Sequence, residues 1–151
     1  MDTLAGHIAP PVSPSPEALP FWEAANRHEL QLPFCDDCEQ YFFYPRALCP
    51  HCGSRKLSWR TATGRGHVYT FCIQYRTSVP GLSDAVPFVT AIVALEEGPR
   101  LMTLLVGVDP KPESVSCDMP VQVDFIDLES GQSLPVFRPV VDRSDVARST
   151  K

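Results

Sequence analysis

The residue types and spacings in this chain that best suit chemistry are four cysteines in two CxxC pairs. Cys35 and Cys38 form the first pair, and Cys49 and Cys52 form the second. Each pair reverses the backbone so that both sulfurs can face one ion, and the ten residues between the pairs allow a short hairpin to bring them together. Four thiolates in a tetrahedron satisfy a structural Zn²⁺ and leave no open position for a substrate or a water. The motif therefore predicts a device that holds the fold together, and function must be sought elsewhere in the chain.

Other uses of these cysteines remain open. The chain has six cysteines, an even number that could form disulfides, but its first 17 residues lack the basic start and apolar core of a secretory signal. We therefore expect a cytoplasmic, reducing setting in which thiolates persist as metal ligands. His51 lies inside the second pair and could replace one sulfur, although the regular pairing of four sulfurs disfavours this. The same sulfurs could also hold iron and make an electron carrier.

The charged residues are distributed unevenly along the chain. The formal net charge is −5, yet residues 40–83 contain no aspartate or glutamate, and six of the thirteen lysines and arginines fall there. These cations are Arg46, Arg55, Lys56, Arg60, Arg65 and Arg76. A contiguous basic face would suit a polyanionic ligand or an acidic partner surface, whereas arginines solvated separately around a ribbon would have no such role.

The pattern of apolar and turn residues predicts a mainly β protein built from small modules. No apolar run approaches the length needed to cross a bilayer. We expect five segments: a flexible proline-rich arm at 1–16, an N-terminal helix at 17–30, a zinc ribbon at 31–62, an OB-fold barrel at 63–141 and a flexible tail at 142–151. Within the helix segment, Pro20 suits a first turn, and the helix runs to His28.

Aromatic residues lie on both sides of the first cysteine pair. Phe21 and Trp22 would share one side of a helix too short to be stable alone, so the helix must pack on its own domain or on another protein. The aromatic run at 41–44 predicts a strand that leaves the first pair, and Leu57 and Trp59 predict another. Such a run can stack nucleic-acid bases, but in a small ribbon it more often surrounds the metal site.

Five short strands are predicted after the hinge sequence at 64–66, Gly-Arg-Gly. The first spans about 68–75, and the others are 88–95, 101–108, 121–128 and 134–140. In the first strand, Val68 faces one side and four larger residues share the other: Tyr69, Phe71, Ile73 and Tyr75. Five strands with turn residues between them predict a small closed barrel of the OB type.

Outside the cysteine pairs, no arrangement typical of a nucleophilic or acid–base catalyst is evident. Two cysteines and two histidines stand alone in the sequence, although partners can meet only in the fold: Cys72, Cys117, His28 and His67. Asp124 and Asp127 would face opposite sides of one strand and are best explained as solvated edge residues. No phosphate-binding glycine loop, HExxH or GxSxG motif is present. The sequence therefore predicts no active site of its own.

The order of these features resembles the DUF35 family. The features are a helix with Phe21 and Trp22, the two cysteine pairs, the linker Gly-Arg-Gly-His-Val-Tyr at 64–69 and the closing segment Leu-Pro-Val-Phe-Arg-Pro-Val at 134–140. Many ribbons share the CxxC pairs, but the whole order is specific, and it covers roughly residues 20–141. The resemblance implies a rubredoxin-like zinc ribbon and an OB fold associated with acyl-CoA.

Membership of this family implies an accessory subunit of a hetero-oligomer, with no activity of its own. Such proteins pair with thiolases, thiolase-like aldolases or synthases, and hydratases that act on acyl-CoA thioesters, and the partner supplies the catalytic cysteine or base. Family members occur in the degradation of aromatic succinates and of steroid side chains. On this basis we expect Phe21 and Trp22 to contact the partner, and Arg65 and Arg76 to meet the phosphates of an acyl-CoA.

Two other classes of function remain open alongside this one. OB folds and aromatic ribbons also bind single-stranded nucleic acid, but the net negative charge and the acids in the barrel segment oppose that use. An enzyme active on its own would need a catalytic arrangement that the sequence does not display.

Overall fold

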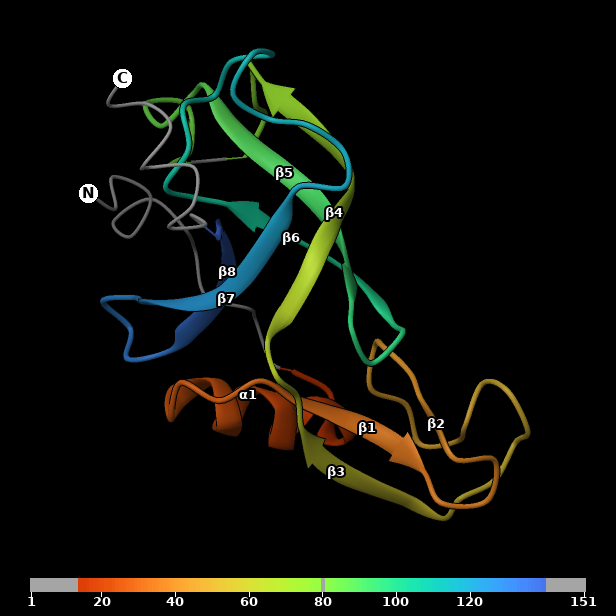
Figure 1. The fold of residues 1–151 in the computed structure, drawn as a ribbon. Helices are drawn as coiled ribbons and strands as arrows, with labels where there is room; N and C mark the ends of the chain where they lie inside the picture. The colour runs from red at the N-terminus through yellow and green to blue at the C-terminus, as the bar shows by residue number, and fades with distance from the viewer. Residues whose placement is uncertain (1–13, 80, 141–151) are drawn as a thin grey trace.

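A computed structural model describes residues 14–79 and 81–140. These residues form a small three-stranded sheet and a closed five-stranded barrel, with one short helix beside them (Figure 1). The prediction of a mainly β fold with an N-terminal helix, a ribbon and an OB-type barrel is confirmed. The predicted tail and most of the predicted arm lie outside the described residues. Among the residues that are described, no helix is long and apolar enough to span a membrane.

The ribbon sheet has the strand order β2-β1-β3 and is antiparallel throughout. Its strands are β1 at Gln31–Cys35, β2 at Gln40–Tyr41 and β3 at Leu57–Thr61. Cys35 ends the central strand and lies opposite Gln40 on one side and Leu57 on the other. The first metal-ligand candidate is therefore held by two neighbouring strands.

The strand predicted at 41–44 is wrong beyond Tyr41. Phe42 is buried at 3% exposure, and the ring of Phe43 packs 5.4 Å from the ring of Phe21. Tyr44 follows, with its ring centroid 6.5 Å from that of Phe21. The rings of Phe43 and Tyr44 thus pack toward the helix instead of continuing the sheet, and aromatic burial of this kind contributes strongly to a small core.

The barrel closes in the order β4-β5-β6-β8-β7, with β7 returning to β4. Its strands are β4 at Arg65–Gln74, β5 at Phe88–Leu95, β6 at Arg100–Leu105, β7 at Pro120–Asp127 and β8 at Ser133–Pro139. All neighbouring pairs are antiparallel except β6 with β8, which meet in parallel. This is the strand arrangement of an OB-type barrel.

A β-bulge in β4 corrects the predicted face of Tyr69. The register against β5 shifts between Val68 and Thr70, so the alternation of side chains is interrupted there. Val68 is fully buried in the barrel core, with Phe71 and Ile73 packed against the same core, whereas Tyr69 is 48% exposed. The prediction that Tyr69 shares a face with Phe71 and Ile73, opposite Val68, is therefore wrong.

The glycines of the hinge at 64–66 are required because neighbouring strands approach the backbone closely there. Gly64 has φ +77°, and a Cβ atom there would lie 2.3 Å from Cγ1 of Val123. A Cβ atom on Gly66 would lie 2.5 Å from the carbonyl oxygen of Ala94. The two glycines allow the ribbon to pass directly into the barrel at the junction of β4, β5 and β7.

The helix is shorter than the predicted 17–30. A 3₁₀ turn, η1, spans Pro16–Ala18, and α1 spans Leu19–Asn26. It ends where His28 takes a left-handed conformation, with φ 59°, and where the N–H of Glu29 donates to the carbonyl of Ala24 at 3.0 Å. The helix packs on the chain's own β1 and β8, as Figure 1 shows for β1.

Polar contacts from the end of α1 hold it to the barrel. The Asn26 side-chain oxygen accepts from the backbone N–H of Ser133 at 2.8 Å and from the side chain of Gln132 at 2.9 Å. The His28 ring stacks on Phe125 with centroids 5.1 Å apart, and its Nε2 lies 2.8 Å from Oδ1 of Asp127. We call this group the helix–barrel latch.

The two strand carboxylates in β7 have partners that the sequence prediction of solvated edge residues did not include. Asp124 forms an ion pair with Arg138, and this hydrogen bond lowers the pKa of Asp124. The Ser133 hydroxyl donates to Asp127 at 2.5 Å and, together with His28, lowers the pKa of Asp127. Both carboxylates thus stabilise the strand pair β7–β8 or its junction with the helix.

Candidate metal centre and the surfaces around it

The four predicted cysteines meet at the tip of the ribbon. Their sulfur atoms all lie within 4.8 Å of one another, and the closest pairs, Cys35 with Cys52 and Cys38 with Cys49, are 3.6 Å apart. A Zn–S bond of about 2.3 Å gives an S–S separation of about 3.8 Å in a regular tetrahedron. The sulfurs are also too far apart for disulfides, in which the two atoms are about 2.05 Å apart. The arrangement fits a four-thiolate metal site.

In the described part of the chain, the cluster of possible metal ligands consists of the four cysteines and does not include His51. Its backbone N–H instead donates to Sγ of Cys49 at 3.4 Å. Burial raises the pKa of the Cys49 thiol, but backbone N–H groups of Cys52 and His51 outweigh that effect and lower it to about 6. Burial and the neighbouring thiols raise the pKa of Cys38 to about 12. The pKa of Cys49 is therefore lowered and that of Cys38 is raised. A metal ion takes thiolates as ligands, so its binding at this cluster would release thiol protons.

Backbone and side-chain hydrogen bonds shape the two loops that present the sulfurs. The N–H of Asp36 donates to the carbonyl of Lys56 at 2.9 Å and ties the first loop to the start of β3. The Ser54 hydroxyl donates to the carboxylate of Asp37 at 2.5 Å, which joins the second loop to the first. These bonds fix the relative position of the two pairs, so the metal site is prepared by the ribbon itself.

The cations of the acid-free stretch have separate environments. Lys56 pairs with Asp37 at 3.7 Å, and the guanidinium of Arg60 lies 3.6 Å over the ring of Phe34. Arg65 is exposed at the start of β4, and Arg76 is exposed just past its end. A ten-residue strand is roughly 30 Å long at about 3.3 Å per residue. The structure does not bring Arg65 and Arg76 together.

The two aromatic residues expected at a partner surface differ in burial. Phe21 is 4% exposed and belongs to the main apolar core, which also contains Leu32 and Val68. Trp22 is half-buried, and its indole N–H donates to the Tyr44 hydroxyl at 3.3 Å. Phe21 therefore packs as a core residue of this chain, and the contact of its side chain with a partner stays a prediction. Trp22 keeps accessible surface.

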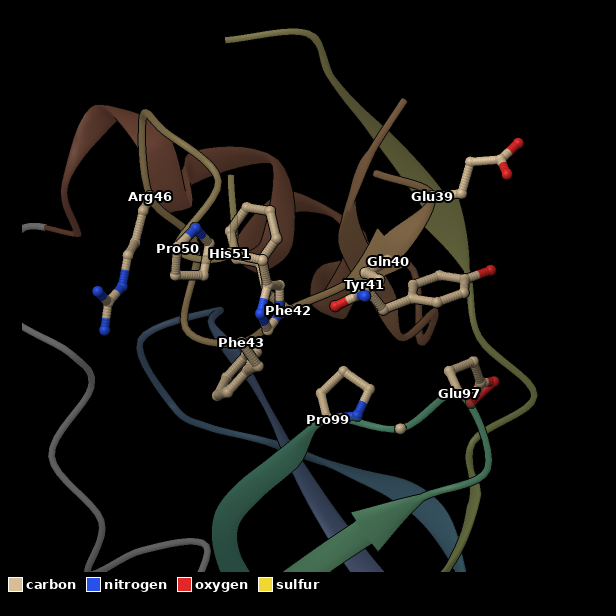
Figure 2. Close-up of a pocket in the computed structure, with 11 residues that line it drawn as sticks. Glu39, Gln40, Tyr41, Phe42, Phe43, Arg46, Pro50, His51, Glu97 and Pro99 are labelled. Atoms are coloured by element: carbon tan, nitrogen blue, oxygen red, sulfur yellow. The ribbon is translucent and has the colours of Figure 1, made fainter. Parts of the chain in front are cut away.

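A cavity of about 520 Å³ lies between the ribbon and the β5–β6 turn (Figure 2). Figure 2 shows Arg46 and His51 on one side of it and Glu39 and Glu97 on the other. The cavity is also lined by Gln40, Tyr41, Phe42, Phe43, Pro50, Gly98 and Pro99. Sequence reasoning missed it, because its walls come from segments that are separated by almost fifty residues and carry no shared motif. Mixed apolar and charged lining at a module junction is typical of a contact site.

A serine, an aspartate and a histidine also meet in the helix–barrel latch, but they do not form a nucleophilic triad. Ser133 and His28 both bond to the same oxygen of Asp127, so the aspartate lies between them. A nucleophilic serine needs the imidazole itself as its hydrogen-bond partner. Ser133 is moreover buried at 3% exposure. No sequence signal could have predicted this meeting of residues about a hundred positions apart.

The fold and the site together define a class of protein in which a four-cysteine ribbon is joined to an OB barrel. Family models match both halves: the "ChsH2, rubredoxin-like zinc ribbon domain" at residues 22–58 and the "ChsH2, C-terminal OB-fold domain" at 59–125. A solved chain described as "Ltp2-ChsH2(DUF35) aldolase" is 34% identical with a TM-score of 0.77, and the match covers 87% of this chain and all of that one. The chain belongs to the DUF35 family.

Two curated relatives widen this comparison. A "Probable enoyl-CoA hydratase alpha subunit" from Thermomonospora curvata is 38% identical over 83% of this chain and 38% of its own length. A "DUF35 domain-containing scaffold protein" from Methanothermobacter thermautotrophicus is 34% identical over 56% of this chain and 64% of its own length. The chain thus spans less than two thirds of either relative. The first relative is thus described as a subunit of an enoyl-CoA hydratase and the second as a scaffold protein with a DUF35 domain.

Proposed function

We propose that this chain is the non-catalytic subunit of a hetero-oligomer in which a thiolase-family partner, a thiolase or a thiolase-like aldolase, acts on bulky acyl-CoA esters. The observation that supports the proposal most is the match, over 87% of this chain and all of the other, to the chain described as "Ltp2-ChsH2(DUF35) aldolase". The partner supplies the reactive groups, and this chain supports its fold and its acyl-CoA channel. The setting is a cytoplasmic degradation pathway for aromatic or steroid side chains.

The chemistry of the described residues supports an accessory role. The cysteine cluster uses all four sulfurs, so a bound Zn²⁺ would have no open position for a substrate. The serine and the histidine of the latch both bond to its aspartate and join the helix to the barrel, so they do not form a catalytic triad. A metal analysis of the purified chain should give one zinc per chain and a colourless protein, whereas iron in the same sulfurs would colour it red.

The acyl-CoA contact remains a proposal for Arg65 and Arg76 separately, because the two lie at opposite ends of β4. Each would meet a phosphate by charge-assisted hydrogen bonds. Arg65→Ala and Arg76→Ala should each be measured for acyl-CoA affinity in the assembled complex, with Arg55→Ala as a control. A loss in only one variant would identify the end of β4 that faces the coenzyme, and no loss in either would remove both residues from the proposal.

The function is tested by purification from the native host. The tagged chain should retain an acyl-CoA-active enzyme in fixed stoichiometry through gel filtration, and thioester conversion should require both components. The isolated chain should convert no acyl-CoA. Turnover by the isolated chain, or recovery of the chain without any acyl-CoA enzyme, would contradict the proposal.

A second function, binding of single-stranded nucleic acid, is favoured by the exposed Tyr69 and Tyr75 on the OB barrel. The net charge of −5 opposes it, because such binding depends on a positive groove. A mobility shift with a twenty-nucleotide single strand at moderate salt separates the two functions, and we expect none.

A further inference from the structure

The outer side of the barrel at β4, β5 and β6 has an unusual surface. In antiparallel pairs, residues directly opposite each other present side chains on the same side of the sheet. His67 lies opposite Ala94, which lies opposite Arg100, and Ile92 lies opposite Met102 in the next outward row. The intervening residues of β5 and β6 face the core. We call the outward residues of these strands the β4–β6 face; those that carry the argument are Arg65, His67, Tyr69, Ile92, Arg100 and Met102.

The middle of this face is accessible and mostly apolar, with the polar Thr70 of β4 opposite Ile92. Met102 is 75% exposed although it lies within a strand, and Tyr69, placed outward by the bulge, is 48% exposed. Ile92, opposite Met102, is only partly buried. The outward side of an antiparallel sheet that faces water normally carries polar residues. Tyrosine, methionine and arginine are the residues enriched in the buried centres of protein interfaces.

The charged residues on the strands of the β4–β6 face are all basic. The 24 residues of the three strands (10, 8 and 6) include no aspartate or glutamate, although the whole chain has 18 acids and a net charge of −5. The cations Arg65 and Arg100 lie toward the ribbon end, as does His67. The carboxylates of the connecting turn, Glu96 and Glu97, accept hydrogen bonds from Thr63. The face therefore complements a surface that is apolar in the middle and acidic at one margin.

The side chains of Tyr69 and Arg100 on the β4–β6 face hold each other in position before any partner binds. The guanidinium carbon of Arg100 lies 3.8 Å from the centroid of the Tyr69 ring, a cation–π contact that limits the freedom of both side chains. Side chains held in this way lose less conformational entropy on binding. Because the cation occupies one face of the ring, Tyr69 offers less surface for stacking of a base than an open tyrosine would.

From these observations, and on the basis of the function proposed above, we infer that the β4–β6 face is the docking surface for the catalytic partner subunit. The partner presents an apolar patch around Met102 and Ile92, bordered by a carboxylate that pairs with Arg100. A second copy of this chain is a poorer occupant, because its own β4–β6 face has no carboxylate to offer Arg100. Nucleic acid is poorer because Met102 and Ile92 do not stack bases.

The test compares two substitutions that each add one negative charge. Met102→Glu places a carboxylate in the apolar centre, whereas Ser130→Glu places it on the exposed β7–β8 turn, outside the face. We expect Met102→Glu to weaken binding of the purified partner about tenfold or more, since burying an unpaired carboxylate is costly. Ser130→Glu should bind as the wild type does, and Met102→Leu should retain most of the affinity. Equal melting temperatures of the isolated variants would show that folding is unaffected.

The other outcomes are also decisive. If the wild-type complex forms and Met102→Glu binds as tightly as Ser130→Glu, this inference fails while the proposed function stands. If no acyl-CoA enzyme binds the wild-type chain, both fail. If Met102→Glu instead abolishes a dimer of the isolated chain, or abolishes binding of a twenty-nucleotide single strand, the face has a different occupant and the inference is overturned.

Discussion

The ribbon and the barrel of this protein are held together by different means. In the ribbon, β1 buries four of its five residues but β3 buries none, whereas in β5 of the barrel five of the eight are buried. The ribbon tip has four sulfurs in place of an apolar interior. A module this small cannot bury enough apolar area to fold alone, so a metal takes that role, while the barrel relies on its core. The comparison teaches that one chain can contain two independent sources of stability.

The junction between the ribbon and the barrel is stabilised by the apolar core of the barrel. Phe21 of α1 and Leu32 of β1 lie in the same apolar core as Val68 and Phe137 of the barrel. The metal therefore stabilises the ribbon tip, and the apolar core stabilises the ribbon base together with the barrel. The following substitutions test where that boundary lies.

The largest effect should come from removal of the metal site. Cys49→Ser, or a strong chelator, should unfold the ribbon tip, because structural zinc sites contribute on the order of 10 kcal/mol to such modules. Hydrogen exchange should accelerate in β2 and in the loops at 36–39 and 49–56 and remain slow in β5. Cys72→Ser, at an exposed cysteine outside the cluster, serves as the control. Equal loss of protection in β5 would mean that the two modules unfold as one.

Phe137→Ala should give the next largest effect and act on the barrel. Phe137 is fully buried, and truncation of such a side chain costs about 3–5 kcal/mol. Urea denaturation followed by circular dichroism measures the change, with Met102→Ala as the exposed control, expected to change stability by less than about 0.5 kcal/mol. Zinc content per folded chain should stay unchanged. Loss of zinc from the folded Phe137→Ala variant would contradict the proposal that the ribbon tip and the barrel are stabilised separately.

Phe21→Ala tests the junction, and it also tests the prediction that this residue contacts the partner. We expect a loss of about 3 kcal/mol in the free energy of unfolding of the isolated chain, because Phe21 is a core residue. Trp22→Ala should cost less and should lower partner affinity, because its side chain keeps accessible surface. Urea denaturation and a binding titration of both variants separate stability from assembly. If Phe21→Ala had the same free energy of unfolding as the wild type, Phe21 would not be part of the folding core.

A smaller effect should come from the ion pair of Asp124 with Arg138. The pKa of Asp124 is lowered in the folded chain, so its contribution is present above the unfolded value of about 3.9 and is lost as the pH falls through the lowered value. The difference in urea midpoint between wild type and Asp124→Asn should be clear at pH 7 and should vanish toward pH 2. Asp84→Asn, at an exposed loop residue, should show little difference at either pH. A difference that does not depend on pH would exclude the ion pair as its cause.

Local patterns were sufficient for the cluster of four cysteines, for most of the barrel strands and for the class of fold. CxxC spacing brings sulfurs together through short-range geometry, and alternation with turn residues marks β5, β7 and β8 to within about one residue. The errors came where distant contacts intervened. The ring of Phe43 packs against Phe21 where a strand was predicted, and one bulge turned Tyr69 outward.

The cysteine motif and the strand pattern could be read from the chain because each depends on residues close together in sequence. The helix–barrel latch, the cavity and the β4–β6 face could not, because they join residues that are distant along the chain. Tertiary packing alone decided that Phe21 lies inside and Met102 outside. The physical reason is that local spacing constrains backbone conformation, whereas burial depends on which other segments fold against a side chain.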